Sequence, residues 1–159
     1  MKLAGVKMEH IYGGSVIKQF ERVQRFQNKI HNQDRDSTEY DDDLLSFFMH
    51  CHHLKDWVEK DPNADTTKQE VEALIANNIE LQICADLAIR SKHVVFDRWP
   101  PRQDAKIISR SVTIDLNIGA STSEHIIMLK DGSEYSALDV ADKAVDIWRQ
   151  LLQSKNLMH

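Results

Sequence analysis

The chain has few of the features that mark secreted, membrane-bound or nucleotide-binding proteins. It contains only two cysteines in 159 residues, and nothing resembles the paired framework of an extracellular disulfide-rich protein. No stretch approaches the roughly 20 apolar residues that span a bilayer, and the N-terminus lacks the apolar run of a signal peptide. Phosphate-binding loops, dinucleotide fingerprints and nucleophile elbows are also absent. We therefore expect a soluble, cytoplasmic protein that has no membrane partner and keeps both cysteines reduced in its core.

The sequence also lacks an excess of positive charge. Lys and Arg number 20 against 25 Asp and Glu, which gives a formal net charge of -5. Proteins that bind duplex DNA neutralise its phosphates with broad basic surfaces, so duplex DNA is not an expected partner. A local basic groove, and with it RNA as a partner, remains open.

Apolar residues recur at helical spacing along the first 95 residues. Thr67 and Glu70 form a capping-box pattern, and Asn77 with Glu80 repeats it. The polar stretch 31–43 reads as a connector, and its acids at 41–43 would enter the first turn of the next helix. The pattern predicts helices at about 15–30, 41–60, from 67 onward, and 78–95.

The period changes after the Trp-Pro-Pro sequence that starts at Trp99. Residues 112–118 alternate between apolar and polar, which predicts a half-buried strand. Residues 125–130 predict a second strand, and residues 130–133 a tight turn after it. Ser136 then caps a final amphipathic helix.

The expected fold class follows from this order of elements. We predict a mainly α protein, a four- to five-helix bundle with a small antiparallel β-hairpin at about 107–131 inserted before the last helix. A single domain would cover residues 1–159, because this length fits one domain and no internal repeat divides it.

Two short runs place titratable side chains on helices that otherwise read as half-buried. They are His-Cys-His-His-Leu-Lys-Asp-Trp at 50–57 and Arg-Ser-Lys-His at 90–93. Buried polar groups need partners, so we expect these two helices to meet and neutralise each other. The residues of this expected polar network are His53, Lys55, Asp56, Trp57, Asp86, Arg90, Lys92 and His93.

Two chemical interpretations stand beside this structural one. The histidines at 50–53 are acceptable zinc ligands, but neighbouring helical positions point about 100° apart, so at most two could bind one ion; we expect no metal or other cofactor. Arg90 and His93 lie three residues apart near a helix end. A histidine can deprotonate a ribose 2′-hydroxyl while a guanidinium binds the phosphate, without a metal.

The runs His-Leu-Lys-Asp-Trp at 53–57 and Leu-Gln-Ile-Cys-Ala-Asp-Leu-Ala-Ile-Arg-Ser-Lys-His at 81–93 resemble those of small uncharacterised bacterial and phage proteins. That family is similar to the HEPN superfamily of four-helix domains, which often dimerise and frequently act as metal-independent endoribonucleases. Active HEPN nucleases separate their arginine and histidine by four to six residues, whereas two lie between Arg90 and His93.

The resemblance implies an HEPN-like interaction module in a prokaryotic stress or phage-defence setting, non-catalytic because of the altered spacing. Its partner would be a second copy or another protein, bound through the second and third helix surfaces. The alternative is an endoribonuclease in which His93 acts as general acid or base. Arg90 and Lys92 would then bind phosphate, while His53 and Asp56 orient the site.

Overall fold

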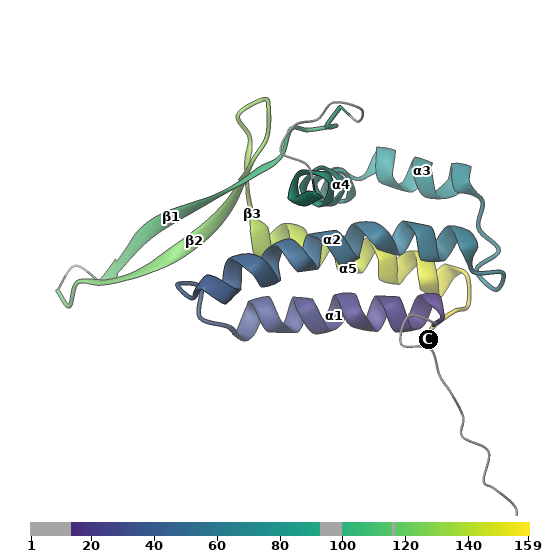
Figure 1. Cartoon of the computed structure of the whole chain (residues 1–159), viewed down its shortest axis with the longest axis horizontal. Helices are drawn as coiled ribbons and strands as arrows, with labels where there is room; N and C mark the ends of the chain where they lie inside the picture. The colour runs from purple at the N-terminus through teal and green to yellow at the C-terminus, as the bar shows by residue number, and fades with distance from the viewer. Residues whose placement is uncertain (1–13, 93–99, 116) are drawn as a thin grey trace, which may run out of the picture.

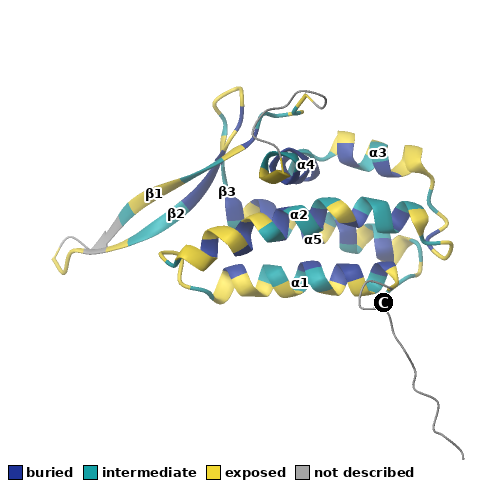
Figure 2. Cartoon of the chain, in the orientation of Figure 1, coloured by how far each residue is buried: buried dark blue, intermediate teal, exposed yellow. Residues whose placement is uncertain are grey.

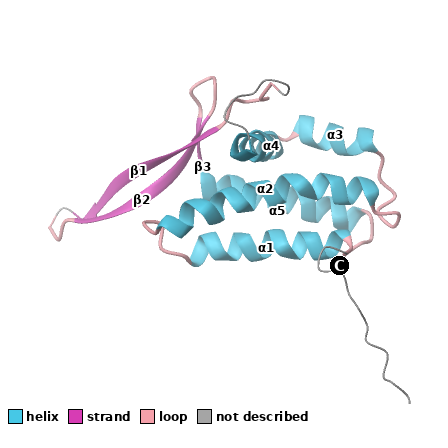
Figure 3. Cartoon of the chain, viewed as in Figure 1, coloured by secondary structure: helices cyan, strands magenta, loops and turns pink. Residues whose placement is uncertain are grey.

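The computed structural model describes residues 14–92, 100–115 and 117–159. It is mainly helical, with a three-stranded antiparallel sheet between the fourth and fifth helices (Figures 1 and 3). The predicted class, a helical protein with a small sheet before the last helix, is confirmed. The helices are α1 (Val16–Asn32), α2 (Thr38–Lys60), α3 (Lys68–Asn77), α4 (Ile79–Lys92) and α5 (Ala137–Ser154), and the strands are β1 (Lys106–Asp115), β2 (Ala120–Met128) and β3 (Glu134–Ser136).

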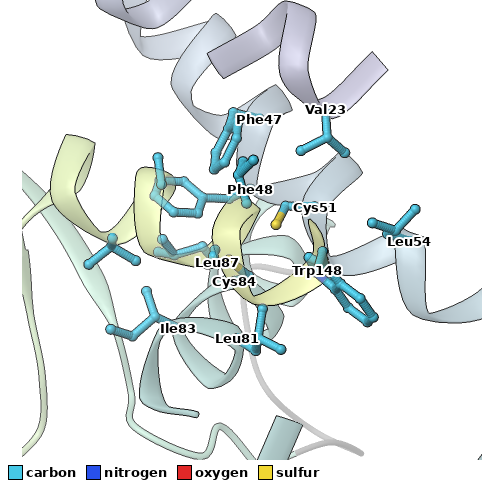
Figure 4. Packing of buried hydrophobic residues seen from close by; sticks show 14 of the residues in the cluster. Val23, Phe47, Phe48, Cys51, Leu54, Leu81, Ile83, Cys84, Leu87 and Trp148 are labelled. Atoms are coloured by element: carbon cyan, nitrogen blue, oxygen red, sulfur yellow. The ribbon is translucent and has the colours of Figure 1, made fainter. Parts of the chain in front are cut away.

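Three helices, α1, α2 and α5, lie lengthwise beside one another, and α4 crosses them steeply, so that Figure 1 shows it almost end-on. Their buried residues lie on the faces turned toward one another, and their exposed residues lie on the outer faces (Figure 2). Phe48 from α2, Leu87 from α4 and Trp148 from α5 meet in one core (Figure 4). Cys51 and Cys84 are buried in this core as free thiols, as predicted. No described helix is long and apolar enough to cross a membrane.

Side-chain caps determine where the helices begin. The capping box of Thr67 and Glu70 is present as predicted. The predicted start of the second helix at residue 41 was wrong, because the Ser37 hydroxyl accepts the N–H of Tyr40 and starts α2 at Thr38. We had expected Asn77 to cap the next helix. This prediction was wrong, because Asn77 is the last residue of α3.

The sheet is larger than the predicted hairpin. β1 begins at Lys106, close to the predicted start of the hairpin at 107, but before the alternating stretch at 112–118, because the adjacent Ile107 and Ile108 interrupt the alternation by which a strand is recognised. The predicted strand at 112–118 extends too far, since β1 ends at Asp115 and Ile118 is 75% exposed. The turn at 130–133 connects β2 to β3, a strand that the sequence pattern did not reveal.

Candidate functional site

A groove of about 720 Å³ lies along α2 and α4 and is completed by Glu72, Pro100 and Arg102. It brings together residues from both sequence runs. Trp57 lies instead on a neighbouring hollow of about 660 Å³, which shares Asp56 with the groove. His93 lies outside the described residues. The predicted residues that line the groove are His53, Lys55, Asp56, Asp86 and Lys92.

The groove carries charges of both signs. Glu72 of α3 lies between two cations: its carboxylate is 4.0 Å from the Lys55 Nζ and 3.0 Å from the Arg102 Nη2. Lys92, which is exposed, and Asp56, which is half-buried, add one charge of each sign to the lining. The groove is therefore not a uniformly basic surface of the kind that binds nucleic acid.

Asp86 lies in α4 and is 1% exposed. One carboxylate oxygen accepts the backbone N–H of Arg102 at 2.8 Å, and the other accepts those of Gln103 at 2.8 Å and Ala105 at 3.2 Å. A carboxylate can be buried only where such donors replace its water. Asp86 therefore fixes the backbone of residues 102–105 onto α4.

Arg90 binds the same segment one helical turn further along. Its Nε donates to the carbonyl oxygen of Ala105 at 3.2 Å, and its Nη2 donates to the Asp104 carboxylate at 2.5 Å. Asp104 has a φ of +50°, a left-handed conformation that aspartate adopts more readily than most residues other than glycine but that still needs support from its surroundings. The ion pair with Arg90 stabilises this conformation, so Asp86 and Arg90 together hold one segment in place.

The histidine string at 50–53 diverges as helical geometry requires. His50 stacks on Phe26 with ring centroids 5.0 Å apart, and burial lowers its pKa. His52 and His53 both line the groove, with ring centroids 6.1 Å apart. In the described part of the chain, no three histidine, cysteine, aspartate or glutamate side chains converge as metal ligands do.

A second pocket, of about 330 Å³, lies where α2, α4 and the sheet meet. Its lining includes Arg90 and a pair that the sequence analysis missed: the His125 Nε2 lies 2.7 Å from the Asp41 Oδ1. His125 is buried, and its Nδ1 has no hydrogen-bond partner among the described residues. Asp41 and His125 are 84 residues apart, so no local pattern could have joined them.

The acids at 41–43 do not act as a group. While Asp41 faces the sheet, Asp43 is buried on the other side and accepts a hydrogen bond from the Lys29 Nζ at 2.8 Å. Consecutive helical residues point in different directions, which is why an acidic triplet on a helix makes a poor metal site.

No family model matches the chain, and neither a curated protein nor a solved structure matches it significantly. The HEPN resemblance therefore depends on the sequence runs at 53–57 and 81–93 and remains a prediction. What the chain can do must be argued from its own groove and pocket.

The position of His52 gives a pH dependence that can be measured. Burial, aided by Lys55, lowers the pKa of His52 from 6.5 to about 4. Between these values the unfolded chain binds more protons than the folded chain, so stability falls as the pH drops from 6.5 toward 4. We expect an NMR titration to place the pKa of His52 near 4. In urea denaturation, the free energy of unfolding should fall less for His52→Gln than for the parent as the pH drops from 6.5 to 4. A ring that titrates near 6.5 would contradict this environment.

Proposed function

We propose that the chain is an HEPN-like, non-catalytic interaction module that binds a protein through the groove along α2 and α4. The observation that carries this proposal is the use of the conspicuous polar residues of α4 in the fold itself. Both carboxylate oxygens of Asp86 accept hydrogen bonds from backbone amides, and Arg90 donates to Asp104 and to the Ala105 carbonyl. Residues committed to these contacts position a binding surface and are poorly placed to take part in a reaction.

The charge pattern of the groove favours a protein partner over RNA. Lys55 and Arg102 already face Glu72, and Asp56 and Lys92 add one charge of each sign to the lining. RNA would require a lining of one sign, whereas a protein surface can supply matching acids and bases at set positions. The prokaryotic stress or phage-defence setting is part of the proposal and comes from the sequence resemblance.

Site-specific photo-crosslinking tests this proposal. A photoreactive amino acid at His53, which is exposed on the groove, should give one recurring protein adduct in cells of the source organism. The same group at Gln150, exposed on α5, is the matched control and should not give that adduct. The charge reversals Lys55→Glu and Asp56→Lys together should reduce the adduct by at least about tenfold.

Two outcomes would contradict the interaction module. One is an adduct at residue 53 that is destroyed by ribonuclease. The other is the absence of any adduct that distinguishes residue 53 from residue 150 when the variants fold as the parent does, as judged by circular dichroism.

A second candidate function, a metal-independent endoribonuclease, is favoured by the pocket that contains Arg90 and the Asp41–His125 pair. A histidine oriented by a carboxylate is the usual form of a general base, and an arginine in the same pocket can stabilise phosphate charge. In this version His125 takes the role that the sequence assigned to His93.

Incubation with a mixed RNA pool in EDTA separates these candidates. The interaction module predicts that the parent is inert. A ribonuclease that uses the pocket predicts cleavage to cyclic phosphate ends, lost by about a hundredfold or more in His125→Asn and retained in His93→Ala. Cleavage that only His93→Ala abolishes would instead support the arginine–histidine pair predicted from sequence.

A further inference from the structure

The sheet has one long open edge. Its strand order is β1-β2-β3, so β1 and β3 are the outer strands, and β1 has 10 residues where β3 has 3. An outer strand exposes a row of unpaired N–H and C=O groups, which proteins commonly protect by shortness, proline, charge or a bulge. β3 is protected by its shortness. β1 contains no proline, and its one irregularity lies near the tip, between Thr113 and Asp115.

The charges on β1 protect this edge weakly, because its two cations, Lys106 and Arg110, are four residues apart and each lies near an acid of its own chain. The Lys106 Nζ lies 3.7 Å from the Asp104 carboxylate, and the Arg110 Nη2 lies 2.9 Å from that of Glu134. The β1–β2 ribbon also extends away from the helices (Figure 1), and no described strand lies on the outer side of β1. The edge is thus both long and accessible.

Apolar surface lies on both sides of this edge. On the face toward the helices, the second pocket places Leu45, 36% exposed, beside Leu44 and Ile107. On the opposite face, Ile108 is half-buried, and Met128 of the neighbouring strand is 36% exposed. A strand added along β1 would cover both surfaces, whereas a ligand in the pocket alone would leave the outer face open.

We propose that β1 pairs antiparallel with β1 of a second copy of this chain, which joins two three-stranded sheets into one of six strands. This interface goes beyond the proposed groove and uses none of its residues. A twofold contact must be self-complementary, because each copy presents the same strand to the other. Two properties of β1 determine which pairing is possible: the positions of its charges, and the stretch before the irregularity at Thr113, where the strand is regular.

The distribution of cations selects the register. An axis at Arg110 would place Arg110 opposite itself, and an axis at Ile108 would place Arg110 opposite Lys106; both arrangements are unfavourable. An axis at Ser109 places Arg110 opposite Ile108 and Lys106 opposite Val112. The paired residues are then 106–112, all before the irregularity at Thr113. The self-complementary register therefore centres on Ser109, which is exposed.

Charge substitution at Ile108 tests both the dimer and its register. In this register residue 108 of each copy lies opposite Arg110 of the other, so the interface contains two such contacts. The dissociation constant of the Ile108→Glu dimer, measured by sedimentation equilibrium, should therefore be at least about tenfold lower than that of the Ile108→Arg dimer. The two variants lose the same apolar side chain, so each controls for the other.

Disulfide trapping fixes the axis independently. With glutathione disulfide as oxidant, Ser109→Cys should crosslink two copies, because residue 109 lies opposite itself in this register. Ser111→Cys should not, because residue 111 lies opposite residue 107. The native Cys51 and Cys84 are buried and should not form crosslinks. The inference is overturned if the parent stays monomeric at all concentrations, if the two Ile108 variants dimerise equally, or if residue 111 crosslinks in place of residue 109. None of these results bears on partner binding in the groove, so the two proposals fail separately.

Discussion

The buried carboxylate of Asp86 attaches the segment that leads into the sheet to the helices. Its three backbone hydrogen bonds attach residues 102–105 to α4, and β1 begins at the next residue, Lys106. The same segment is bound from the other side, where the N–H of Lys130 donates to the Gln103 carbonyl at 2.9 Å. One carboxylate in the fourth helix thus fixes the point at which the chain enters the sheet.

This arrangement explains why the polar run in α4 is conspicuous without being arranged for catalysis. A buried charge that lost its donors would cost several kcal/mol, so the segment and the carboxylate require each other. Arg90 strengthens the attachment through Asp104 and brings its guanidinium to the pocket beside His125. The groove on the other side of α4 is thus bordered by a segment that several hydrogen bonds hold in place, which lowers the entropic cost of binding a partner there.

The sequence predicted what depends on near neighbours along the chain. The capping box at Thr67, the turn at 130–133 and the buried thiols of Cys51 and Cys84 all follow from spacing or composition, and the structure contains them. Asp86 and Arg90 were recognised as polar residues needing partners. Their partners lie 14 to 19 residues away, beyond a proline-containing segment, and helical periodicity carries no information about such contacts.

The parts that were missed depend on long-range contacts. His125 pairs with Asp41 across 84 residues, and β3 exists because its three residues meet the end of β2. The first residues of β1 show no alternation, because Ile107 faces the helices while Ile108, beside it, lies on the other side of the sheet. Strand limits of this kind follow from tertiary packing rather than from local propensity.

Amide hydrogen exchange at residues 102, 103 and 105 tests the role of Asp86 most directly. If the carboxylate holds this segment, the three amides exchange slowly in the parent and at least about tenfold faster in Asp86→Asn, since each loses a hydrogen bond to a charged acceptor. Asp56→Asn, which alters a half-buried carboxyl on α2, should leave them unchanged. Fast exchange in the parent, or equal exchange in both variants, would contradict the account.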